Sequence, residues 1–217
     1  MKIKICGITK LDQLIAIDKL GIDFAGMIFY PASPRYILNK LNSKQVAETT
    51  LKLKKVGVFV NATEEDIMTM VDAYHLDLVQ LHGDETPGFC KQISNKISVL
   101  KAFRINERNE KNIDWLIKPF EEYVDFYLFD TFSKNGYGGT GAQFNWKALQ
   151  DSVINKEFFL SGGIGIDDTE EIKKFRHPNF YGIDLNSKLE IQPGIKDLEK
   201  IKIISALNNH QPIIAGN

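Results

Sequence analysis

Eight short β-rich runs, separated by segments with helical spacing, limit the folds open to this chain more than any other feature. The runs are Ile3–Ile8, Phe24–Phe29, Lys55–Val60, Leu76–His82, Ser98–Phe103, Asp125–Thr131, Glu157–Gly162 and Phe180–Leu185. Between them, apolar residues recur at helical spacing before Gly21, a residue type that ends helices, and after Thr63, a type that begins them. Strands that alternate with helices form βαβ units and therefore a parallel sheet.

The number of runs and the chain length together indicate the kind of parallel sheet. Eight strand–helix units in 217 residues favour a closed (β/α)8 barrel (TIM barrel) over an open doubly wound sheet. No linker or low-complexity tract interrupts the sequence, so residues 1–217 are predicted to form one domain.

Composition and charge exclude several classes of function. The formal net charge of −1 provides no basic surface for nucleic acid. No apolar run reaches the length of a signal peptide, or the ~20 residues of a membrane span, so a cytoplasmic protein with no membrane contact is expected. Its two cysteines, Cys6 and Cys90, are then expected to be free thiols in a reducing compartment.

Polar residues gather where several of the predicted strands end, which is where ligands bind in barrels of this kind. Side chains alternate along a strand, so Lys4 and Cys6 share the inner face if Ile3 and Ile5 face the helices. The polar positions found by this counting are Lys4 with Cys6, Gln80 with His82, Asp130, and Asp184. We expect Gln80, His82 and Asp184 to bind a substrate.

Cys6 and Asp130 are the candidates for proton transfer. A thiolate can act as a base, and Lys4 on the same face would favour it; the alternative is a small strand-end residue without chemistry. Asp130 can act as a general acid if the apolar residues beside it favour its protonated form, or it can cap a helix or fix a loop. A thiolate facing a carboxylic acid suits an isomerisation, which moves a proton between adjacent atoms.

The residues Ser161, Gly162 and Gly163 after the seventh run form the candidate phosphate site. Glycines allow backbone N–H groups to face an anion, and a helix beginning at about Asp167 adds partial positive charge. Barrels usually bind phosphate at the loops after strands seven and eight, which brings in the Asn186–Ser187 turn. A tight turn without a ligand is the simpler interpretation of a diglycine.

Two loops and the histidines complete the candidates. Arg35, in a proline-stiffened loop, can clamp a carboxylate or remain a solvated charge. The glycine-rich stretch SKNGYGGTGAQFNW, with Gly141, can close over a substrate or serve as a flexible connection. No spacing typical of metal ligands joins His82 to the other three histidines, so no metal is expected.

Eight stretches, in this order, resemble the phosphoribosylanthranilate isomerase family of tryptophan biosynthesis: KICGIT, SPRYI, VGVFVN, LVQLHGDE, LFDT, GGTGAQFNW, LSGGI and PGIKD. The resemblance runs nearly end to end. It implies a (β/α)8 barrel, no cofactor, and a small phosphoribosyl substrate. The implied reaction is an Amadori rearrangement of N-(5-phosphoribosyl)anthranilate to 1-(2-carboxyphenylamino)-1-deoxyribulose 5-phosphate. A monomer or homodimer is expected.

The resemblance also implies roles for individual residues. Asp130 matches the general acid, which would protonate the ribose ring oxygen and open the sugar to a Schiff base. Cys6 matches the general base, which would remove the C2 proton to give an enolamine. Arg35 matches the residue that holds the anthranilate carboxylate, and the diglycine of LSGGI and the Asn186–Ser187 turn match the phosphate loops.

One segment departs from the family's pattern. After the eighth strand the family reads D-V-S-S-G-V-E, whereas this chain has DLNSKLE, with Asn186 for the first serine and Lys188 for the glycine. Asparagine can still bond a phosphate and tolerates left-handed backbone. Lys188 costs about 1 kcal/mol or more if its position needs a positive φ, or adds a cation near the phosphate. We expect Lys188→Gly to change KM and to leave kcat within a few-fold.

Three other functions fit parts of the pattern. An epimerase would need paired carboxylates or metal-binding histidines at strand ends, and the sequence lacks them. The neighbouring indole-forming synthase would need a strand-end lysine and glutamate, for which Lys4 and Lys101 are weak candidates. A barrel that binds a phosphate ligand without chemistry is the third, although it would not need both Cys6 and Asp130.

Overall fold

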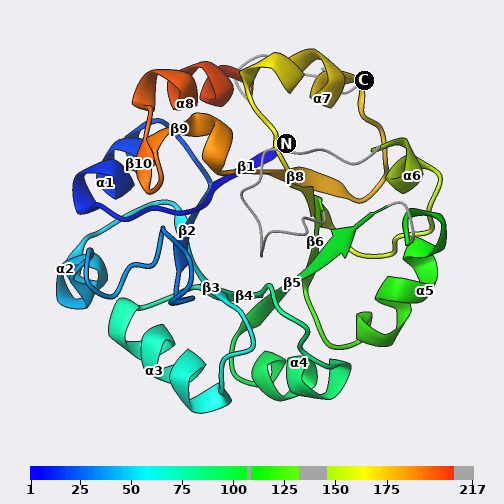
Figure 1. The fold of residues 1–217 in the computed structure, drawn as a ribbon, viewed down its shortest axis with the longest axis horizontal. Helices are drawn as coiled ribbons and strands as arrows, with labels where there is room; N and C mark the ends of the chain where they lie inside the picture. The colour runs from blue at the N-terminus through cyan, green and yellow to red at the C-terminus, as the bar shows by residue number, and fades with distance from the viewer. Residues whose placement is uncertain (107–108, 132–145, 208–217) are drawn as a thin grey trace, which may run out of the picture.

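Eight parallel strands pair in chain order and close into a barrel, with β1 hydrogen-bonded to β8 (Figure 1). The computed structural model describes residues 1–106, 109–131 and 146–207. Strands β1 to β8 span Lys2–Ile5, Phe24–Ile28, Lys54–Phe59, Leu78–Leu81, Ser98–Ile105, Phe126–Thr131, Phe158–Leu160 and Phe180–Leu185. The predicted (β/α)8 barrel is therefore confirmed.

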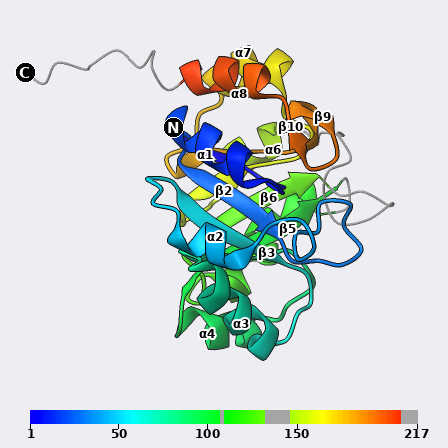
Figure 2. The ribbon, with the colours of Figure 1, turned by 90° about the vertical axis from the view of Figure 1, so that its left-hand side faces the viewer.

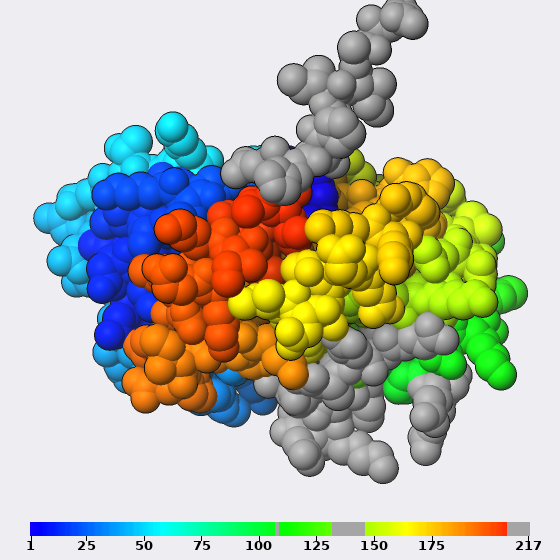
Figure 3. Space-filling model, turned by 90° about the horizontal axis from the view of Figure 1, so that it is seen from above, coloured from blue at the N-terminus to red at the C-terminus, as the bar shows by residue number. Residues whose placement is uncertain are grey.

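Helices surround the barrel on the outside (Figures 1 and 2). Helices α1 to α8 span Leu11–Lys19, Ser43–Glu48, Glu64–Tyr74, Pro87–Ser94, Ile113–Ile117, Lys147–Gln150, Thr169–Lys174 and Leu198–Ser205. Four short 3-10 helices, η1 to η4, span Glu110–Asn112, Lys118–Phe120, Ile166–Asp168 and Ser187–Leu189. Helices α7 and α8 lie side by side on one flank, as Figure 3 shows. Within the described residues, no helix has the length and apolar character needed to cross a membrane.

An antiparallel hairpin follows β8 and precedes α8. It consists of β9 (Glu190–Gln192) and β10 (Ile195–Lys196). In Figure 1 the hairpin lies beside α1 and α8, at the seam where the first and last strand–helix units meet. It therefore brings residues near the end of the chain against residues near its beginning.

Side-chain alternation separates an inner core from an outer one. Ile3 and Ile5 of β1 pack outward among the apolar faces of the helices. The inner core consists of Phe24, Val56, Leu78, Leu100, Ala102, Leu128 and Phe159. Lys4 is buried inside the barrel beside Asp184, so the face predicted for it is confirmed. Burial of each large apolar side chain stabilises the fold by roughly 1.5–3 kcal/mol.

Local signals fix where several elements begin and end. The Thr63 side chain accepts a hydrogen bond from the Asp66 N–H at 3.1 Å and caps α3. Gly21, with φ of +76°, follows the end of α1. β1 ends at Ile5 and β7 at Leu160, both earlier than predicted, because Gly7 and Gly162 turn the chain with φ of +78° and +94°. The residues just before these glycines therefore lie where the loops begin.

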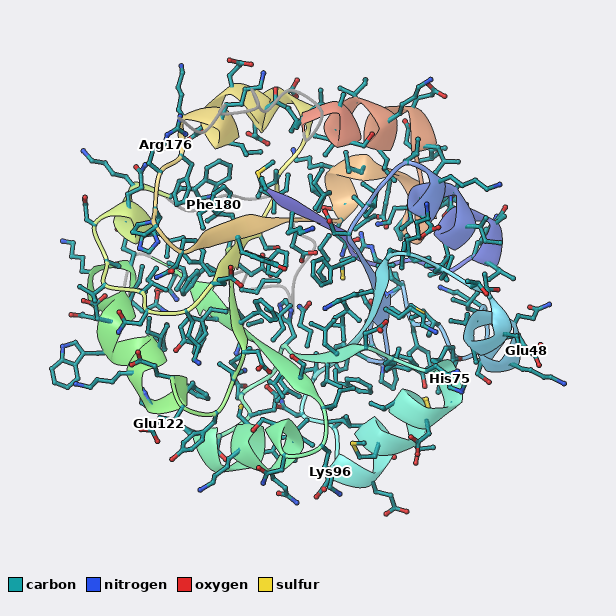
Figure 4. The ribbon with its side chains drawn as sticks, turned by 180° about the vertical axis from the view of Figure 1, so that it is seen from behind. Glu48, His75, Lys96, Glu122, Arg176 and Phe180 are labelled. Carbon is teal, nitrogen blue, oxygen red and sulfur yellow. The ribbon has the colours of Figure 1, made fainter. Side chains whose placement is uncertain are left out.

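Several charged residues on the outside of the barrel point into solvent. Figure 4 shows Glu48, Lys96 and Glu122 directed outward from the helix layer, and all three are exposed. Phe180, at the start of β8, instead packs edge-on against Phe175, with ring centroids 4.9 Å apart.

Candidate active site

A pocket at the carboxyl ends of the strands brings together ten of the predicted site residues. They are Cys6, Arg35, Gln80, His82, Asp130, Gly162, Gly163, Asp184, Asn186 and Ser187. Apolar side chains of Ile28, Val58 and Ile164 complete parts of the wall. Gly141 and residues 133–145 of the glycine-rich stretch lie outside the described part of the chain.

The Cys6 thiol lies at the end of β1, close to a buried ion pair. Lys4 Nζ is 2.7 Å from Asp184 Oδ1, and Ser161 Oγ donates to Asp184 Oδ2 at 3.3 Å. Burial raises the pKa of the Cys6 thiol, the positive charges of Lys4 and Lys196 lower it, and Asp184 raises it. The net pKa lies above the ordinary thiol value. Lys4 favours the thiolate as predicted, but burial outweighs it.

Cys90 provides a contrast to Cys6. Both cysteines are free, as predicted, and both are buried. Cys90 lies on α4 among apolar residues of the outer core, away from the pocket lining. Burial raises the pKa of its thiol to about 11. Cys90 is therefore an inert core residue and a natural control for substitutions at Cys6.

Asp130 is one end of a chain of three buried polar side chains. Asp130 Oδ2 lies 3.2 Å from His82 Nε2, and Asp130 Oδ1 accepts a hydrogen bond from the Thr131 N–H at 2.9 Å. On the other side of the imidazole, His82 Nδ1 lies 2.6 Å from Gln80 Nε2. The carboxyl group therefore faces the pocket and a histidine ring.

The orientation of the Gln80 amide decides which His82 nitrogen carries a proton. If the amide NH2 donates to Nδ1, the ring proton lies on His82 Nε2, which is 3.2 Å from Asp130 Oδ2 but makes no hydrogen bond to it in this geometry. That arrangement leaves Gln80 Oε1 buried without a partner among the described residues. If the amide is turned over, Oε1 accepts from Nδ1–H, and Nε2 becomes the unprotonated ring nitrogen on the side of Asp130. Turning the amide over pairs Oε1 but leaves the amide NH2 in the position without a partner, so the two arrangements differ in which imidazole nitrogen carries the proton.

Arg35 reaches the pocket wall, but one edge of its guanidinium is already paired. Nε lies 2.9 Å from Glu190 Oε1, and Nη2 lies 2.7 Å from Glu190 Oε2. Glu190 does not engage the Nη1 side of the guanidinium. Sequence analysis missed Glu190 because 155 residues separate it from Arg35; its place in DLNSKLE was the available signal.

The turn after β7 has a backbone that glycine adopts most readily. Gly162 and Gly163 have φ of +94° and +67°. A Cβ at Gly162 would lie 2.7 Å from the Thr131 backbone nitrogen, so a side chain does not fit there. Successive residues with this backbone conformation can direct N–H groups to one anion. The Asn186–Ser187 turn lines the same pocket.

Lys188 does not have the strained backbone considered for it. Among the described residues other than glycine, only Asn61 and His75 have positive φ values. Lys188 lies in η4 and is exposed. A cost of positive φ at Lys188 is therefore ruled out, and the residue fits its position without the glycine that the family usually has.

The structure also bears on the alternative enzymes. Lys101 points outward from β5, where its Nζ lies 2.9 Å from Glu85 Oε2 and 2.9 Å from the Gly83 carbonyl oxygen. Lys101 therefore does not provide the pocket lysine that an indole-forming synthase would need. Lys4, the other candidate, is paired with Asp184. Across the part of the chain that the structure describes, no group of three His, Cys, Asp or Glu residues could hold a metal ion.

Comparison with known proteins identifies the family. A family model for N-(5'phosphoribosyl)anthranilate (PRA) isomerase matches residues 3–206. The chain belongs to the PRA isomerase family. The N-(5'-phosphoribosyl)anthranilate isomerase of Parabacteroides distasonis is 42% identical over 206 residues, covering 93% of this chain and 90% of that protein. The chain is therefore an enzyme, a PRA isomerase of tryptophan biosynthesis.

Solved PRA isomerases share the barrel. The enzyme from Thermotoga maritima superimposes with a TM-score of 0.83 at 31% identity, covering 97% of this chain and all of that one. Another solved PRA isomerase holds reduced 1-(o-carboxyphenylamino)-1-deoxyribulose 5-phosphate. It superimposes with a TM-score of 0.79 at 29% identity and equal coverage. The family resemblance carried by the eight sequence stretches is confirmed.

Proposed function

We propose that the pocket converts N-(5-phosphoribosyl)anthranilate to 1-(2-carboxyphenylamino)-1-deoxyribulose 5-phosphate, with Asp130 as general acid and Cys6 as general base. The observation that carries this proposal is that Cys6, after β1, and Asp130, on β6, line one pocket. The reduced product bound by a solved family member supports the choice of ligand.

The substrate has an anion at each end, and the pocket has groups suited to both. Gly162, Gly163 and the Asn186–Ser187 turn would bind the phosphate through N–H and hydroxyl groups. Arg35 would bind the anthranilate carboxylate through the Nη1 side of its guanidinium, because Glu190 occupies the other edge. Two charged ends would fix the ribose between the acid and the base.

The reaction would begin at Asp130. Its proton would pass to the ribose ring oxygen as the C1–O bond breaks, and the anthranilate nitrogen would form a C=N bond to C1. The contact between Asp130 and His82 would hold the carboxyl proton before this step. Gln80 Oε1 would support it by accepting from His82 Nδ1–H.

Cys6 would carry out the second proton transfer. Its thiolate would take the C2 proton, the C–H electrons would form a C1–C2 double bond, and the C=N electrons would return to nitrogen. The enolamine then tautomerises to the ketone. Because burial disfavours the thiolate, the positive charges of Lys4 and Lys196 are needed to make it accessible.

A coupled fluorescence assay tests the proposal. N-(5-phosphoribosyl)anthranilate is generated in situ from anthranilate, and its loss is followed with wild type, Cys6→Ala and Asp130→Asn. Each variant is expected to lose at least about 10²-fold in kcat, because each lacks one proton-transfer group. Cys90→Ala, which removes the thiol outside the pocket, is the matched control and should keep the wild-type kcat.

Two outcomes would contradict this function. Folded Cys6→Ala or Asp130→Asn with nearly wild-type kcat would remove that residue from the mechanism. A folded wild type that binds a product analogue without turning over substrate would instead favour the phosphate-binding alternative. Titration of the analogue into wild type and Cys6→Ser separates binding from turnover.

A further inference from the structure

A buried lysine behind the pocket wall contacts groups that serve both ends of the proposed substrate. Lys196, the last residue of β10, is 2% exposed. Its Nζ lies 2.8 Å from Glu190 Oε1, 2.9 Å from Asn186 Oδ1 and 3.4 Å from the Asn186 carbonyl oxygen. Its backbone is also held, because Lys196 N–H donates to Gln13 Oε1 at 3.1 Å and Gln13 Nε2 donates to the Lys196 carbonyl oxygen at 2.9 Å.

The contact with Lys196 fixes the orientation of the Asn186 amide. An ammonium group can only donate hydrogen bonds, so the amide oxygen of Asn186 must face Lys196. The amide nitrogen is then the end of the side chain left for the pocket, which Asn186 lines. A phosphate oxygen accepts hydrogen bonds from such an N–H2 group. This contact gives a physical role to the asparagine that replaces the family's serine.

The same cluster holds Arg35 through a shared carboxylate. Glu190 accepts from Lys196 Nζ, from Arg35 and from the Gly194 N–H at 3.0 Å. One carboxylate between two cations leaves one uncompensated positive charge. A Cβ at Gly7 would lie 2.7 Å from both Arg35 Cδ and Asn186 Oδ1, so the cluster packs directly against the residue after the proposed base.

We propose that Lys196 is a positioning residue that turns the Asn186 amide toward the substrate's phosphate and, through Glu190, aims Arg35 at its carboxylate. This inference rests on the proposed function and adds a residue to it. Lys196 makes no contact with reacting atoms in this role. From its buried position near the junction of β1 and β8, Lys196 orients both Asn186 and Arg35.

The charge of Lys196 has a second consequence, at Cys6. The charged groups that act on the thiol are Lys4 of β1, Asp184 of β8 and Lys196 of β10. Burial is the largest effect and raises the pKa of Cys6, whereas both lysines lower it. Burial lowers the pKa of Lys196 itself, with Glu190 and Cys6 opposing and Arg35 adding to the effect. Removal of the Lys196 charge should therefore make the Cys6 thiolate harder to form.

Lys196→Met tests the proposal because methionine is unbranched and only one atom shorter than lysine, but it lacks the charge and the donors. We expect KM for N-(5-phosphoribosyl)anthranilate to rise about 10-fold or more, since two substrate-binding groups lose their support. The pH at which Cys6 reacts half-maximally with iodoacetamide, followed on its peptide by mass spectrometry, should move upward. Lys202→Met, at an exposed lysine on α8 outside the pocket lining, is the matched control. It should leave KM within about two-fold and the pH of half-maximal Cys6 reaction unchanged.

The affinity for inorganic phosphate, measured by calorimetry on the folded protein, tests the Lys196–Asn186 contact separately from the contacts of Arg35. This affinity should fall about 10-fold in Asn186→Ala and in Lys196→Met, and little further in the double variant, because both act through one amide. Unchanged phosphate affinity and unchanged KM in folded Lys196→Met would overturn the proposal. A lower melting temperature with neither change would indicate a purely structural lysine.

Two further measurements distinguish failure of this inference from failure of the proposed function and from failure of the variant to fold. If wild type has no isomerase activity, the proposed function fails, while the phosphate titrations still test the Lys196–Asn186 contact. If Lys196→Met does not fold, Glu190→Gln and Asn186→Ala carry the test. Glu190→Gln should raise KM several-fold because Arg35 loses its charged partner, and a wild-type KM in both variants would overturn the proposal.

Discussion

At the scale of the residue, the Gln80 side chain determines how His82 meets Asp130. Gln80 is 1% exposed, and its Nε2 lies 2.6 Å from His82 Nδ1. A buried amide beside an imidazole has two orientations, and each permits a different distribution of protons over His82 and Asp130. In the proposed mechanism, Gln80 would act on the chemistry through His82 and Asp130.

Gln80→Met should separate kcat from KM. Methionine fills a similar volume but neither donates to nor accepts from His82 Nδ1, so the proton on Asp130 loses its support. We expect kcat to fall about 10-fold, because loss of one buried hydrogen-bond partner costs roughly 1–3 kcal/mol, while KM changes less than about three-fold. Steady-state kinetics measure both. Gln92→Met, an exposed glutamine on α4, is the control; an equal rise in KM for Gln80→Met would assign Gln80 to substrate binding alone.

At the scale of the element, strand alternation explains what the sequence predicts well. Ile3 and Ile5 mark the outer face of β1, so Lys4 and Cys6 are assigned inward, and the structure agrees for Lys4 and places Cys6 in the pocket. The same reasoning gives no answer for Lys101, because each face of the run Ser98–Phe103 has two apolar residues and one polar residue. Alternation identifies the inner face only where the side chains of the two faces differ in polarity.

The loops show why other site residues escape sequence analysis. Glu190 and Lys196 belong to a two-stranded hairpin outside the barrel, and neither lies at the end of a barrel strand. Their partners Arg35 and Gln13 are 155 and 183 residues away along the chain. Local pattern carries no information about such contacts, which depend on the closure of the barrel. The strand-end residues, in contrast, follow from the strand pattern alone.

The turn after β7 requires glycine at position 162 for two reasons. The φ of Gly162 is +94°, and a Cβ would lie 2.7 Å from the Thr131 nitrogen. Gly162→Ala should weaken inorganic phosphate binding at least about 10-fold and lower the free energy of unfolding by more than the ~1 kcal/mol cost of positive φ alone. Calorimetry and urea unfolding measure these quantities.

Gly21→Ala is the matched control for Gly162→Ala. Gly21 has a similar φ of +76°, but a Cβ there meets nothing within 4 Å. It should therefore show the cost of positive φ without loss of phosphate affinity. Equal effects of the two substitutions on stability, with phosphate binding retained in both, would contradict the assignment of the Gly162 turn to the phosphate site.

At the scale of the whole molecule, one side of the site lies where the first and last barrel strands meet. β1 and β8 pair from Lys2–Gly182 to Ile5–Leu185, and the Lys4–Asp184 ion pair spans the same seam. Arg35–Glu190 and Gln13–Lys196 add contacts between early residues and the late hairpin. We propose that residues 1–217 form one domain, supported by the family match over residues 3–206. Closure of the barrel and assembly of the site are then one event.

The stability of the barrel should depend on acid pH through Glu190 at this seam. Burial raises the pKa of Glu190, but the hydrogen bonds from Arg35 and Lys196 and the Lys196 charge outweigh it, so the pKa lies below the ordinary value of 4.5. The unfolded chain therefore binds more protons at acid pH, and ionised Glu190 stabilises the fold above the unfolded pKa. That contribution is lost as pH falls from about 5 through the folded pKa.

Urea unfolding at several pH values below about 5 measures this contribution against a matched variant. The free energy of unfolding of wild type should fall with pH more steeply than that of Glu190→Gln, because glutamine does not titrate. Glu48→Gln, at an exposed position on α2, should keep the wild-type slope. A wild type and a Glu190→Gln variant with parallel pH dependences would mean that Glu190 has the same proton affinity folded and unfolded. The Arg35–Glu190–Lys196 cluster would then contribute no charge stabilisation to the seam on which both the barrel and the pocket depend.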